Sequence, residues 1–539
     1  MFTAGNIGHL LVLSSFVFSF VFLVSYLISE KSRDKISWIK FGKINFWLHS
    51  FFLLSVILTL YYIIISDNFR YYYAFQHSSS LLPIYYKISS FWEGQEGSFL
   101  LWMFWNVIIG IYFILKPDSK WNTSLMIVLG FTQFLLSSMI LGVVIYDLKI
   151  GSSPFILLSD AISAPIFELD PNYIPEDGSG LNPLLQNYWM VIHPPTLFLG
   201  FAVSIVPFSY AISSLRLRSY KSWVAPAKKW LLISIVVLGI GIMMGAYWAY
   251  ETLNFGGYWN WDPVENAVYV PWLFLVASLH SIILTQKNKQ HYKMSLILSV
   301  TSFILILYST FLTRSGILGD SSVHSFTDLG LSGQLLVYML SFVLISIYLL
   351  VSRWKEIPYS DKEAKVYSGD FWLFVGVYTL ILMSFQVIFP TSIPVYNAIV
   401  ELFGGFSNLA PPVEKELFYS NAQIWFASCL AIFSSIAQVL WWRGKKAKEK
   451  FALFSKSIVF TIVTSSLIIL FYPITVPSYM VLITASLFSI FSNGSVLIFF
   501  FRKKDLLSSG SIAHVGLAIM LIGILFSSGY SSIQSNNYT

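Results

Sequence analysis

Long apolar runs recur along the whole chain, and this feature constrains the fold more than any other. An α-helix needs about 17–25 mostly apolar residues to cross the hydrocarbon core of a bilayer. With 56% hydrophobic and 11% charged residues among 539, the composition does not fit an ordinary water-soluble core. The sequence therefore predicts an all-α, polytopic integral membrane protein, with a single membrane domain over residues 1–539. Hydropathy places about fourteen membrane helices, at 7–27, 46–65, 98–115, 124–146, 190–212, 230–250, 266–285, 295–312, 331–351, 371–389, 424–441, 457–471, 478–501 and 512–527.

The placement of lysine and arginine predicts the orientation of these helices. Seven alternate loops hold 28 of the 33 lysines and arginines, and neither terminus holds any. Because cytoplasmic loops are enriched in these residues, the basic loops are expected inside and both termini outside. The pI near 9.0 then reflects topology, and binding to nucleic acid is not expected. The basic loops are 28–45, 116–123, 213–229, 286–294, 352–370, 442–458 and 502–511.

The chain has little thiol chemistry of its own. Its single cysteine, Cys429, lies in the predicted helix 424–441, where a small buried hydrophobic residue is expected. No disulfide or CxxC pair can form within the chain, so any thiols used in a reaction must come from a partner.

The longest loops of the chain are among those expected outside. Loop 147–189 contains five prolines and several acidic residues, so an irregular outward cap over the helices is expected there. Loop 251–265 leads into a segment rich in aromatic residues. The longest outward loops are 66–97, 147–189, 251–265, 313–330 and 390–423.

That segment, GGYWNWDPVENAVYVPWL at 256–273, begins with a turn followed by a helix start. Gly256 and Gly257 allow the backbone to turn. Asp262 suits the N-cap position, Pro263 the first helical position, and Glu265 the third, from which its side chain faces back toward the cap. The two acids are therefore expected to cap the helix rather than to act as catalytic acids.

Tyr258, Trp259 and Trp261 lie between this turn and the cap, on a segment expected at the outer membrane surface. One interpretation is an interfacial belt, where Trp and Tyr are enriched in any membrane protein. The other is a flat apolar platform for a flat ligand. The double glycine and the rigid Asp-Pro boundary favour the platform, because a belt needs neither, but both interpretations stay open.

Two of the eight histidines are expected on the outer side. His193 stands in WMVIHPPTLFLG, where Pro194 is expected to start the helix and to hold the imidazole ring at the outer surface. His324 lies in RSGILGDSSVHSF, on the outward loop after the eighth helix. The two bracket the aromatic segment in sequence, as two axial ligands on opposite faces of a porphyrin could. Alternatively, each is an ordinary loop histidine.

Three other histidines are expected at similar depths in the inner half of the membrane. His280, His514 and His49 lie 7, 10 and 6 residues from cations of inner loops, which is roughly 9–15 Å along a helix. Ionisable groups inside membrane segments are functional candidates. Any two of the three could bind a heme, although His49, nearest a helix end, is the most consistent with a merely interfacial position.

The aromatic segment resembles the WWD signature of the heme-handling proteins of cytochrome c maturation. Together with IHPP, LTRSGIL followed by VHSF, WEGQEGSFLLW and SIAHVGLAIMLIG, it makes the chain similar to the CcmF/NrfE family of cytochrome c heme lyase subunits. The resemblance runs from AGNIGHLLVLSS near the start to the last helix. The WWD tract alone indicates only heme handling, whereas the IHPP motif and the chain order separate this family from the shorter CcsA-type synthases.

The resemblance implies roles for individual residues. His193 and His324 match the axial ligands of the heme that is delivered for attachment. His280 and His514 match a membrane-embedded pair that holds a resident b-type heme. Arg314 could pair a heme propionate or, alternatively, be a helix-end arginine that reaches the interface. Residues 251–273 would be the heme-handling segment, in which Gly256, Gly257, Tyr258, Trp259, Trp261 and Asp262 cradle the incoming heme.

The chain departs from the family pattern in three places. Phe255 stands where the family usually has a tryptophan, and Gln95 stands where a histidine is frequent. Family members commonly continue into another outward domain and a final helix, and both are expected to be absent here because the sequence stops at Thr539.

The resemblance also implies an activity, partners and a location. A CcmE-like heme chaperone would present heme at the outer face of a bacterial inner membrane, where apocytochrome c offers its reduced CxxCH segment. In a complex with CcmH- and CcmI-like subunits, the chain would act as a holocytochrome-c synthase type heme lyase that promotes thioether formation. Quinol would supply electrons to the resident b heme, which keeps the attached iron ferrous.

Other functions are less consistent with the sequence. A heme transmembrane exporter is the alternative, since a heme site and many helices suit both functions. An antiporter-like subunit would need lysine or acidic residues in mid-membrane, and the predicted helices contain essentially none. A structural scaffold gives no reason for four histidines at two matched depths.

Overall fold

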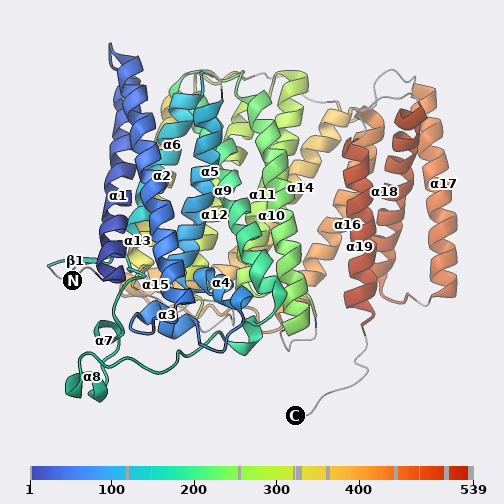
Figure 1. Cartoon of the computed structure of the whole chain (residues 1–539). Helices are drawn as coiled ribbons and strands as arrows, with labels where there is room; N and C mark the ends of the chain where they lie inside the picture. The colour runs from blue at the N-terminus through green and yellow to red at the C-terminus, as the bar shows by residue number, and fades with distance from the viewer. Residues whose placement is uncertain are drawn as a thin grey trace. The chain divides into compact units, whose positions relative to one another are not determined.

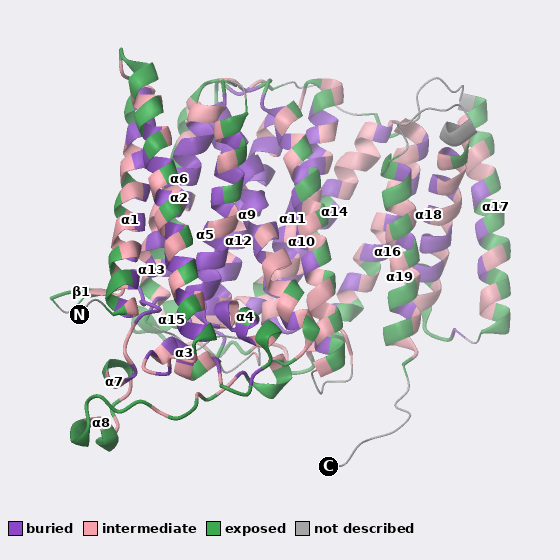
Figure 2. Cartoon of the chain, viewed as in Figure 1, coloured by how far each residue is buried: buried purple, intermediate pink, exposed green. Residues whose placement is uncertain are grey.

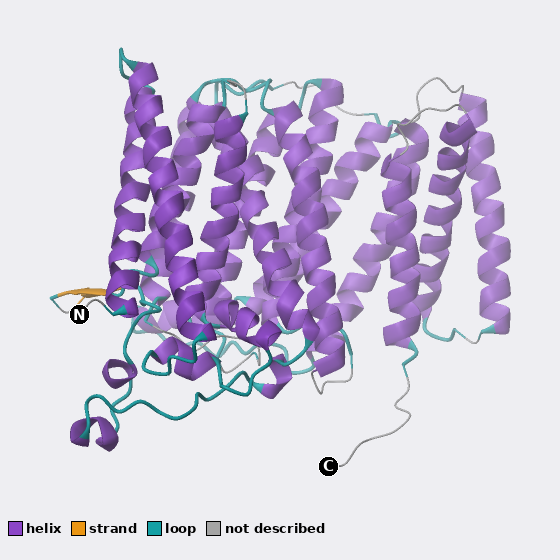
Figure 3. Cartoon of the chain, viewed as in Figure 1, coloured by secondary structure: helices purple, strands orange, loops and turns teal. Residues whose placement is uncertain are grey.

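The computed structural model describes residues 3–116, 120–146, 148–252, 257–319, 322, 330–359, 365–441, 447–472, 474–502 and 509–531. Helices dominate these residues, and thirteen of them are long and apolar enough to cross a membrane (Figure 3). The predicted all-α polytopic membrane fold is confirmed. The helices are α1 (Ala4–Ser29), α2 (Lys35–Ile65), α3 (Tyr72–His77), α4 (Ile84–Glu93), α5 (Gln95–Leu115), α6 (Asn122–Ser138), α7 (Leu158–Ala161), α8 (Pro165–Leu169), α9 (Tyr188–Arg216), α10 (Val224–Thr252), α11 (Pro263–Asn288), α12 (Tyr292–Arg314), α13 (Ser332–Arg353), α14 (Gly369–Thr391), α15 (Ile393–Leu402), α16 (Lys415–Trp441), α17 (Ala447–Phe471), α18 (Pro477–Arg502) and α19 (Ser509–Gly529), with a 3-10 turn at Pro183–Leu185.

One predicted membrane helix, 124–146, ends earlier than expected. Its helix, α6, stops at Ser138 after 17 residues, which extend roughly 26 Å. Gly142 then adopts a left-handed φ of 60°, and the apolar residues that follow form β1 (Val143–Ile145), paired antiparallel with β2 (Leu148–Ile150). The prediction of helix to residue 146 is wrong because an apolar run does not by itself distinguish a helix from a hairpin strand.

Contacts between Cα atoms divide the chain into two compact units. Unit 1 comprises Met1–Leu275 and Ser299–Ile357, and unit 2 comprises Val276–Leu298 and Pro358–Thr539. The boundaries fall inside α11 and α12, so both helices contribute residues to both units. In unit 1, α9 is the most enclosed membrane helix, since 83% of the residues in its most apolar 18-residue stretch are buried (Figure 2).

One end of unit 1 is built from short elements. Helices α3, α4, α7 and α8 lie at the end of the bundle where the chain begins (Figure 1). The loop expected at 147–189 is indeed mostly irregular, and Asp177 fastens it to the earlier outward loop by accepting hydrogen bonds from the backbone and side chain of Ser80 at 2.7 and 3.0 Å. The backbone N–H of Ser80 contributes most to holding the pKa of the Asp177 carboxyl below its ordinary value.

Several serines inside the membrane helices donate to a backbone carbonyl of their own helix. The hydroxyl of Ser204 donates to the carbonyl of Gly200 at 2.7 Å, and Ser209 makes the same bond to Ile205. Such bonds to the carbonyl four residues earlier let serine lie in an apolar interior without an unpaired donor. The many serines in these helices are therefore compatible with membrane insertion.

Helices α9 and α10 approach each other closely through glycine. A Cβ added to Gly200 on α9 would lie 2.9 Å from the Cα of Leu238 on α10, and one added to Gly241 on α10 would lie 3.0 Å from the Cα of Leu197. Small residues at helix crossings let backbones pack tightly in membranes. These glycines are needed for space.

Gly200→Ala is expected to destabilise the protein by about 1–3 kcal/mol, because the new methyl group overlaps the backbone of α10. The thermal midpoint of the purified protein in detergent measures the effect. Gly333→Ala is the matched control, since nothing lies within 4 Å of a Cβ at Gly333 on α13. Equal midpoints for the two variants would contradict the close packing of α9 against α10.

Candidate functional site

The start of α11 is a reciprocal cap, as the sequence predicts. The carboxylate of Asp262 accepts a hydrogen bond from the backbone N–H of Val264 at 2.9 Å. The carboxylate of Glu265 reaches back and accepts from the backbone N–H groups of Asp262 and Asn260, both at 3.0 Å. Both acids are thus engaged in structure, and the capping interpretation is confirmed.

The rings of the aromatic segment pack against one another. Trp259 and Trp261 meet edge to face with ring centres 5.8 Å apart, and each lies 5.9 Å from the ring of Tyr269. We call these three residues the aromatic cluster. The planes cross at 70–90°, so the three rings do not form one flat surface. A ligand could stack on a single ring only.

Sequence reasoning misses Tyr269, although a signal exists. It follows Glu265 by one helical turn, so the cap and the ring share one face of α11. Trp272, three residues further along, stacks near Tyr269 with ring centres 6.4 Å apart. The Trp272 indole N–H donates to the carbonyl of Ile235 on α10 at 3.0 Å, which fixes this face of the helix.

Trp261 has an unusual backbone conformation. Its φ is +52°, in the left-handed region that a bulky side chain rarely occupies. Such a conformation costs of the order of 1–3 kcal/mol and persists only where neighbours impose it. Here Asn266 donates to the Trp261 carbonyl at 3.1 Å, and Glu265 holds the amides on either side. Gly257 and Tyr258 belong to the same described segment, whereas Gly256 lies outside the described residues.

Ser322 connects the cap to the segment that carries His324. The Ser322 hydroxyl donates to the Asp262 carboxylate at 2.6 Å, and its backbone N–H donates to the carbonyl of Leu318 at 3.0 Å. His324 lies outside the described residues, two positions further along the chain. Sequence reasoning could not find this contact because 60 residues separate its partners.

Helix α9 begins before His193, so the prediction that Pro194 starts the helix is wrong. Asn187 caps the helix by accepting from the backbone N–H of Trp189 at 2.9 Å. A proline inside a helix leaves the carbonyl four residues earlier without its donor. For Pro194 that carbonyl belongs to Met190, and the indole N–H of Trp92 supplies the missing bond at 2.9 Å.

The His193 ring lies between α9 and α10 and is partly exposed. Its Nδ1 donates to the carbonyl of Gly241 at 2.9 Å, which places the lone pair of the neutral ring on Nε2. A Cβ at Gly245 would lie 2.7 Å from the ring, so glycine makes room for it. The ring therefore has the fixed tautomer typical of an iron ligand.

Arg314 is buried at the end of α12 rather than exposed on a loop. Its guanidinium lies 5.6 and 5.4 Å from the rings of Phe99 and Phe198, and only 7% of the residue is exposed. The side chain of Arg314 therefore does not extend away from the protein toward the membrane interface. The buried Glu96, which accepts from Ser152 at 2.6 Å, also attracts Arg314 electrostatically.

The structure pairs two of the three inner histidines. The rings of His280 on α11 and His514 on α19 lie 6.2 Å apart, centre to centre, with planes 20° apart, and both belong to unit 2. His49 belongs to unit 1, where it is fully buried and donates from Nδ1 to the carbonyl of Ser15 at 2.9 Å. His49 is therefore not interfacial, and it is not part of the pair.

The geometry of His280 and His514 fits a metal held between two imidazoles. Metal–imidazole bonds of about 2.0–2.1 Å place the two ring centres roughly 6 Å apart. The Nδ1 of His280 donates to the carbonyl of Val276 at 2.8 Å, so its Nε2 carries the lone pair. Among the described residues no group of three or more His, Cys, Asp or Glu side chains could hold a metal ion. A two-ligand site of the heme type fits this pair best.

Comparisons with known proteins show which family the chain resembles. A family model described as "Cytochrome C assembly protein" matches residues 92–318. The cytochrome c-type biogenesis protein CcmF of Pseudomonas fluorescens is 30% identical over 416 residues, which are 77% of this chain and 59% of that protein. CcmF of Escherichia coli is 29% identical over 90% of this chain and 72% of its own length.

A solved structure titled "Cytochrome c Heme Lyase CcmF" has the same fold. It superposes with a TM-score of 0.73 over 98% of this chain and 78% of its own, at 21% identity. The chain spans 59% of the Pseudomonas fluorescens relative and 48% of CcmF from Pseudomonas aeruginosa.

Glu265→Ala is expected to loosen the aromatic segment, because the amides of Asn260 and Asp262 lose their acceptor. Hydrogen–deuterium exchange of peptides covering 257–262 should become faster, and loss of the cap should cost about 0.5–2 kcal/mol. Glu168→Ala removes the same charge from the exposed helix α8 and should leave exchange in this segment unchanged. Unaltered exchange in Glu265→Ala would show that the cap does not hold the segment.

Proposed function

Because this chain belongs to the CcmF/NrfE family of cytochrome c-type biogenesis proteins, we propose that it is a heme lyase subunit that promotes the covalent attachment of heme to apocytochrome c. The pairing of His280 with His514 is the observation that carries this proposal. The aromatic cluster, His193 and Ser322 all belong to unit 1, whereas the histidine pair belongs to unit 2. Two separate sites suit a protein that handles one heme as substrate and holds another.

The outer site would bind and orient the substrate heme. A heme chaperone of the CcmE kind delivers the heme, and Nε2 of His193 is the nitrogen placed to ligate its iron. The aromatic cluster offers single ring faces for stacking against the porphyrin. The bond from Ser322 to Asp262 holds Ser322 at the start of α11, and Ser322 stands two positions before His324, which would be the second ligand.

Attachment itself would be carried by groups of the substrates. Each thiol of the CxxCH segment adds its sulfur and its hydrogen across one heme vinyl group, so that two thioether bonds form and nothing is released. The contribution of this chain is to hold the vinyl groups and the incoming peptide in one orientation. Because Cys429 lies in the membrane helix α16, both thiols come from the apocytochrome.

The inner pair would hold a resident b heme. His280 and His514 would hold it from α11 and α19, and the bond from His280 to Val276 fixes the tautomer of His280. Such a heme would supply one-electron chemistry, with quinol as the electron donor and the ferric iron of the substrate heme as the acceptor. The setting is a bacterial inner membrane, with CcmH- and CcmI-like subunits as further partners.

Substitutions in the two pairs of histidines are expected to remove different properties of the protein. His280→Ala or His514→Ala should remove the low-spin b-heme spectrum of the purified protein or make that heme five-coordinate. His193→Ala or His324→Ala should leave this spectrum unchanged and abolish attachment to apocytochrome c. Absorbance spectra, pyridine hemochrome and covalent heme staining of the cytochrome measure the two effects, and added imidazole should partly restore each variant.

His291→Ala is the control in unit 2, because His291 lies near Phe374 and is not one of the paired histidines. It should change neither spectrum nor attachment. A wild-type protein that purifies without heme would favour a heme exporter over a lyase. Loss of the resident spectrum in His193→Ala, with retention in His514→Ala, would overturn the assignment of the sites.

Trp259→Ala combined with Trp261→Ala should weaken capture of chaperone-delivered heme by roughly 1.5–3 kcal/mol, because the double variant loses the apolar stacking area of whichever indole the porphyrin contacts. Copurification of heme with the chaperone complex measures capture. Both rings precede α11, so the resident spectrum should persist and shows that the double variant is folded. If capture is not weakened, the aromatic segment is an ordinary interfacial belt and does not bind heme.

A further inference from the structure

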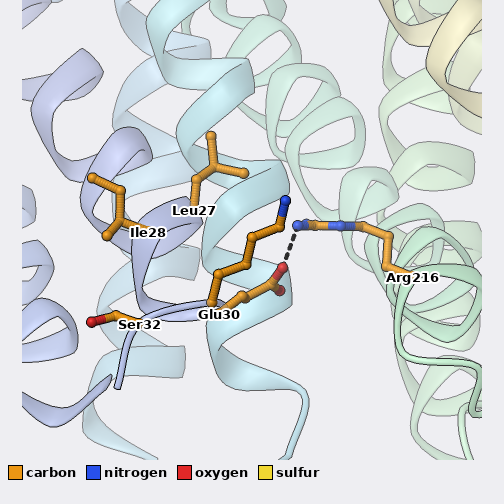
Figure 4. Close-up of a pocket in the computed structure, with 6 residues that line it drawn as sticks. Leu27, Ile28, Glu30, Ser32 and Arg216 are labelled. Carbon is orange, nitrogen blue, oxygen red and sulfur yellow. Dashed lines mark hydrogen bonds and ion pairs between the residues drawn. The ribbon is translucent and has the colours of Figure 1, made fainter. Parts of the chain in front are cut away.

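A pocket opens in unit 1 where two membrane helices end (Figure 4). Leu27 and Ile28 belong to the last turn of α1, Glu30 follows as its C-cap, and Arg216 is the last residue of α9. Lys31 and Ser32 complete the lining. The sequence analysis places this end among the basic loops, so the pocket lies where a membrane helix meets the headgroup region.

The polar lining has one unsatisfied acceptor beside two cations. The Arg216 guanidinium donates to Oε2 of Glu30 at 2.5 Å, as Figure 4 shows. The other oxygen, Oε1, is buried and has no hydrogen-bond partner. A buried carboxylate oxygen is costly to leave without a donor. With Lys31 exposed nearby, the lining carries one net positive charge.

The apolar lining faces the surroundings of the helix bundle. Leu27 and Ile28 are 41% and 38% exposed, although they lie in a membrane helix. Val17 and Phe20 continue the exposed apolar face along α1. This face contacts acyl chains in a bilayer, so a ligand of the pocket can be polar at one end and apolar at the other.

We propose that this pocket binds a phospholipid whose headgroup carries a phosphate and hydrogen-bond donors, with phosphatidylglycerol as the best match. Its phosphate lies near Lys31 and Arg216, and a glycerol hydroxyl donates to Oε1 of Glu30. One acyl chain follows Leu27 and Ile28. The single negative charge of this lipid balances the net charge of the lining, and cations near the surface favour anionic lipids.

Related headgroups provide a test of this assignment. Phosphatidylethanolamine has a donor in its ammonium group but no net charge, so it should bind less tightly. Phosphatidylcholine has neither an N–H nor an O–H in its headgroup and cannot satisfy Glu30. The expected order of affinity is therefore phosphatidylglycerol, then phosphatidylethanolamine, then phosphatidylcholine.

The experiment is native mass spectrometry of the full chain, delipidated in detergent and titrated with each lipid. Lys31→Gln should weaken phosphatidylglycerol binding about fivefold, as expected for one cation at the membrane surface. Lys35→Gln is the matched control, an exposed lysine at the start of α2 and outside the pocket, and it should bind as the wild type does.

A further arm tests the contribution of the acyl chain. Inorganic phosphate at millimolar concentration should not displace the lipid, since it lacks the acyl chain. Equal binding of phosphatidylglycerol and phosphatidylcholine by the wild type, unchanged binding by Lys31→Gln, or displacement by phosphate would overturn the proposal.

Discussion

The carboxylates of Asp262 and Glu265 accept hydrogen bonds from both sides of the aromatic segment, and the outward site depends on them. Glu265 fixes the amides before α11, which lets Trp261 keep a left-handed backbone beside Trp259. Asp262 caps the helix and also accepts from Ser322, the last described residue before His324. The start of α11 thus holds the backbone of the aromatic segment and also binds Ser322, 60 residues further along the chain.

Features that depend on local chemistry could be predicted from the sequence. The membrane helices follow from apolar length, and the cap of α11 follows from the order of Asp262, Pro263 and Glu265. Depth in the membrane brings His280 and His514 into one small group of candidates. The predicted depth does not distinguish this pair from His49, because the pairing depends on which helices are neighbours in the fold.

Predictions from the sequence fail where a side chain far away in the sequence alters the local structure. Pro194 lies inside α9 because the indole of Trp92 donates to the carbonyl of Met190, 98 residues away from it, and so replaces the donor that proline lacks. The edge-to-face angles of the aromatic cluster could not be predicted, because they depend on how Tyr269 of α11 packs against the two tryptophans. Likewise, the division into two units crosses α11 and α12, whose apolar runs are continuous and give no sign of a boundary.

The left-handed backbone at Trp261 lowers the stability of the fold, while the side chain that it carries supplies a ring of the aromatic cluster. Glycine would adopt this φ without strain, so replacing the tryptophan by glycine relieves the backbone while it removes a ring from the cluster. A lineage selected only for thermal stability would tend to lose this indole, whereas one that needs the ring must keep bearing the conformational cost. Backbone strain of this kind clusters at functional sites, so the conformation of Trp261 points to a use for its ring.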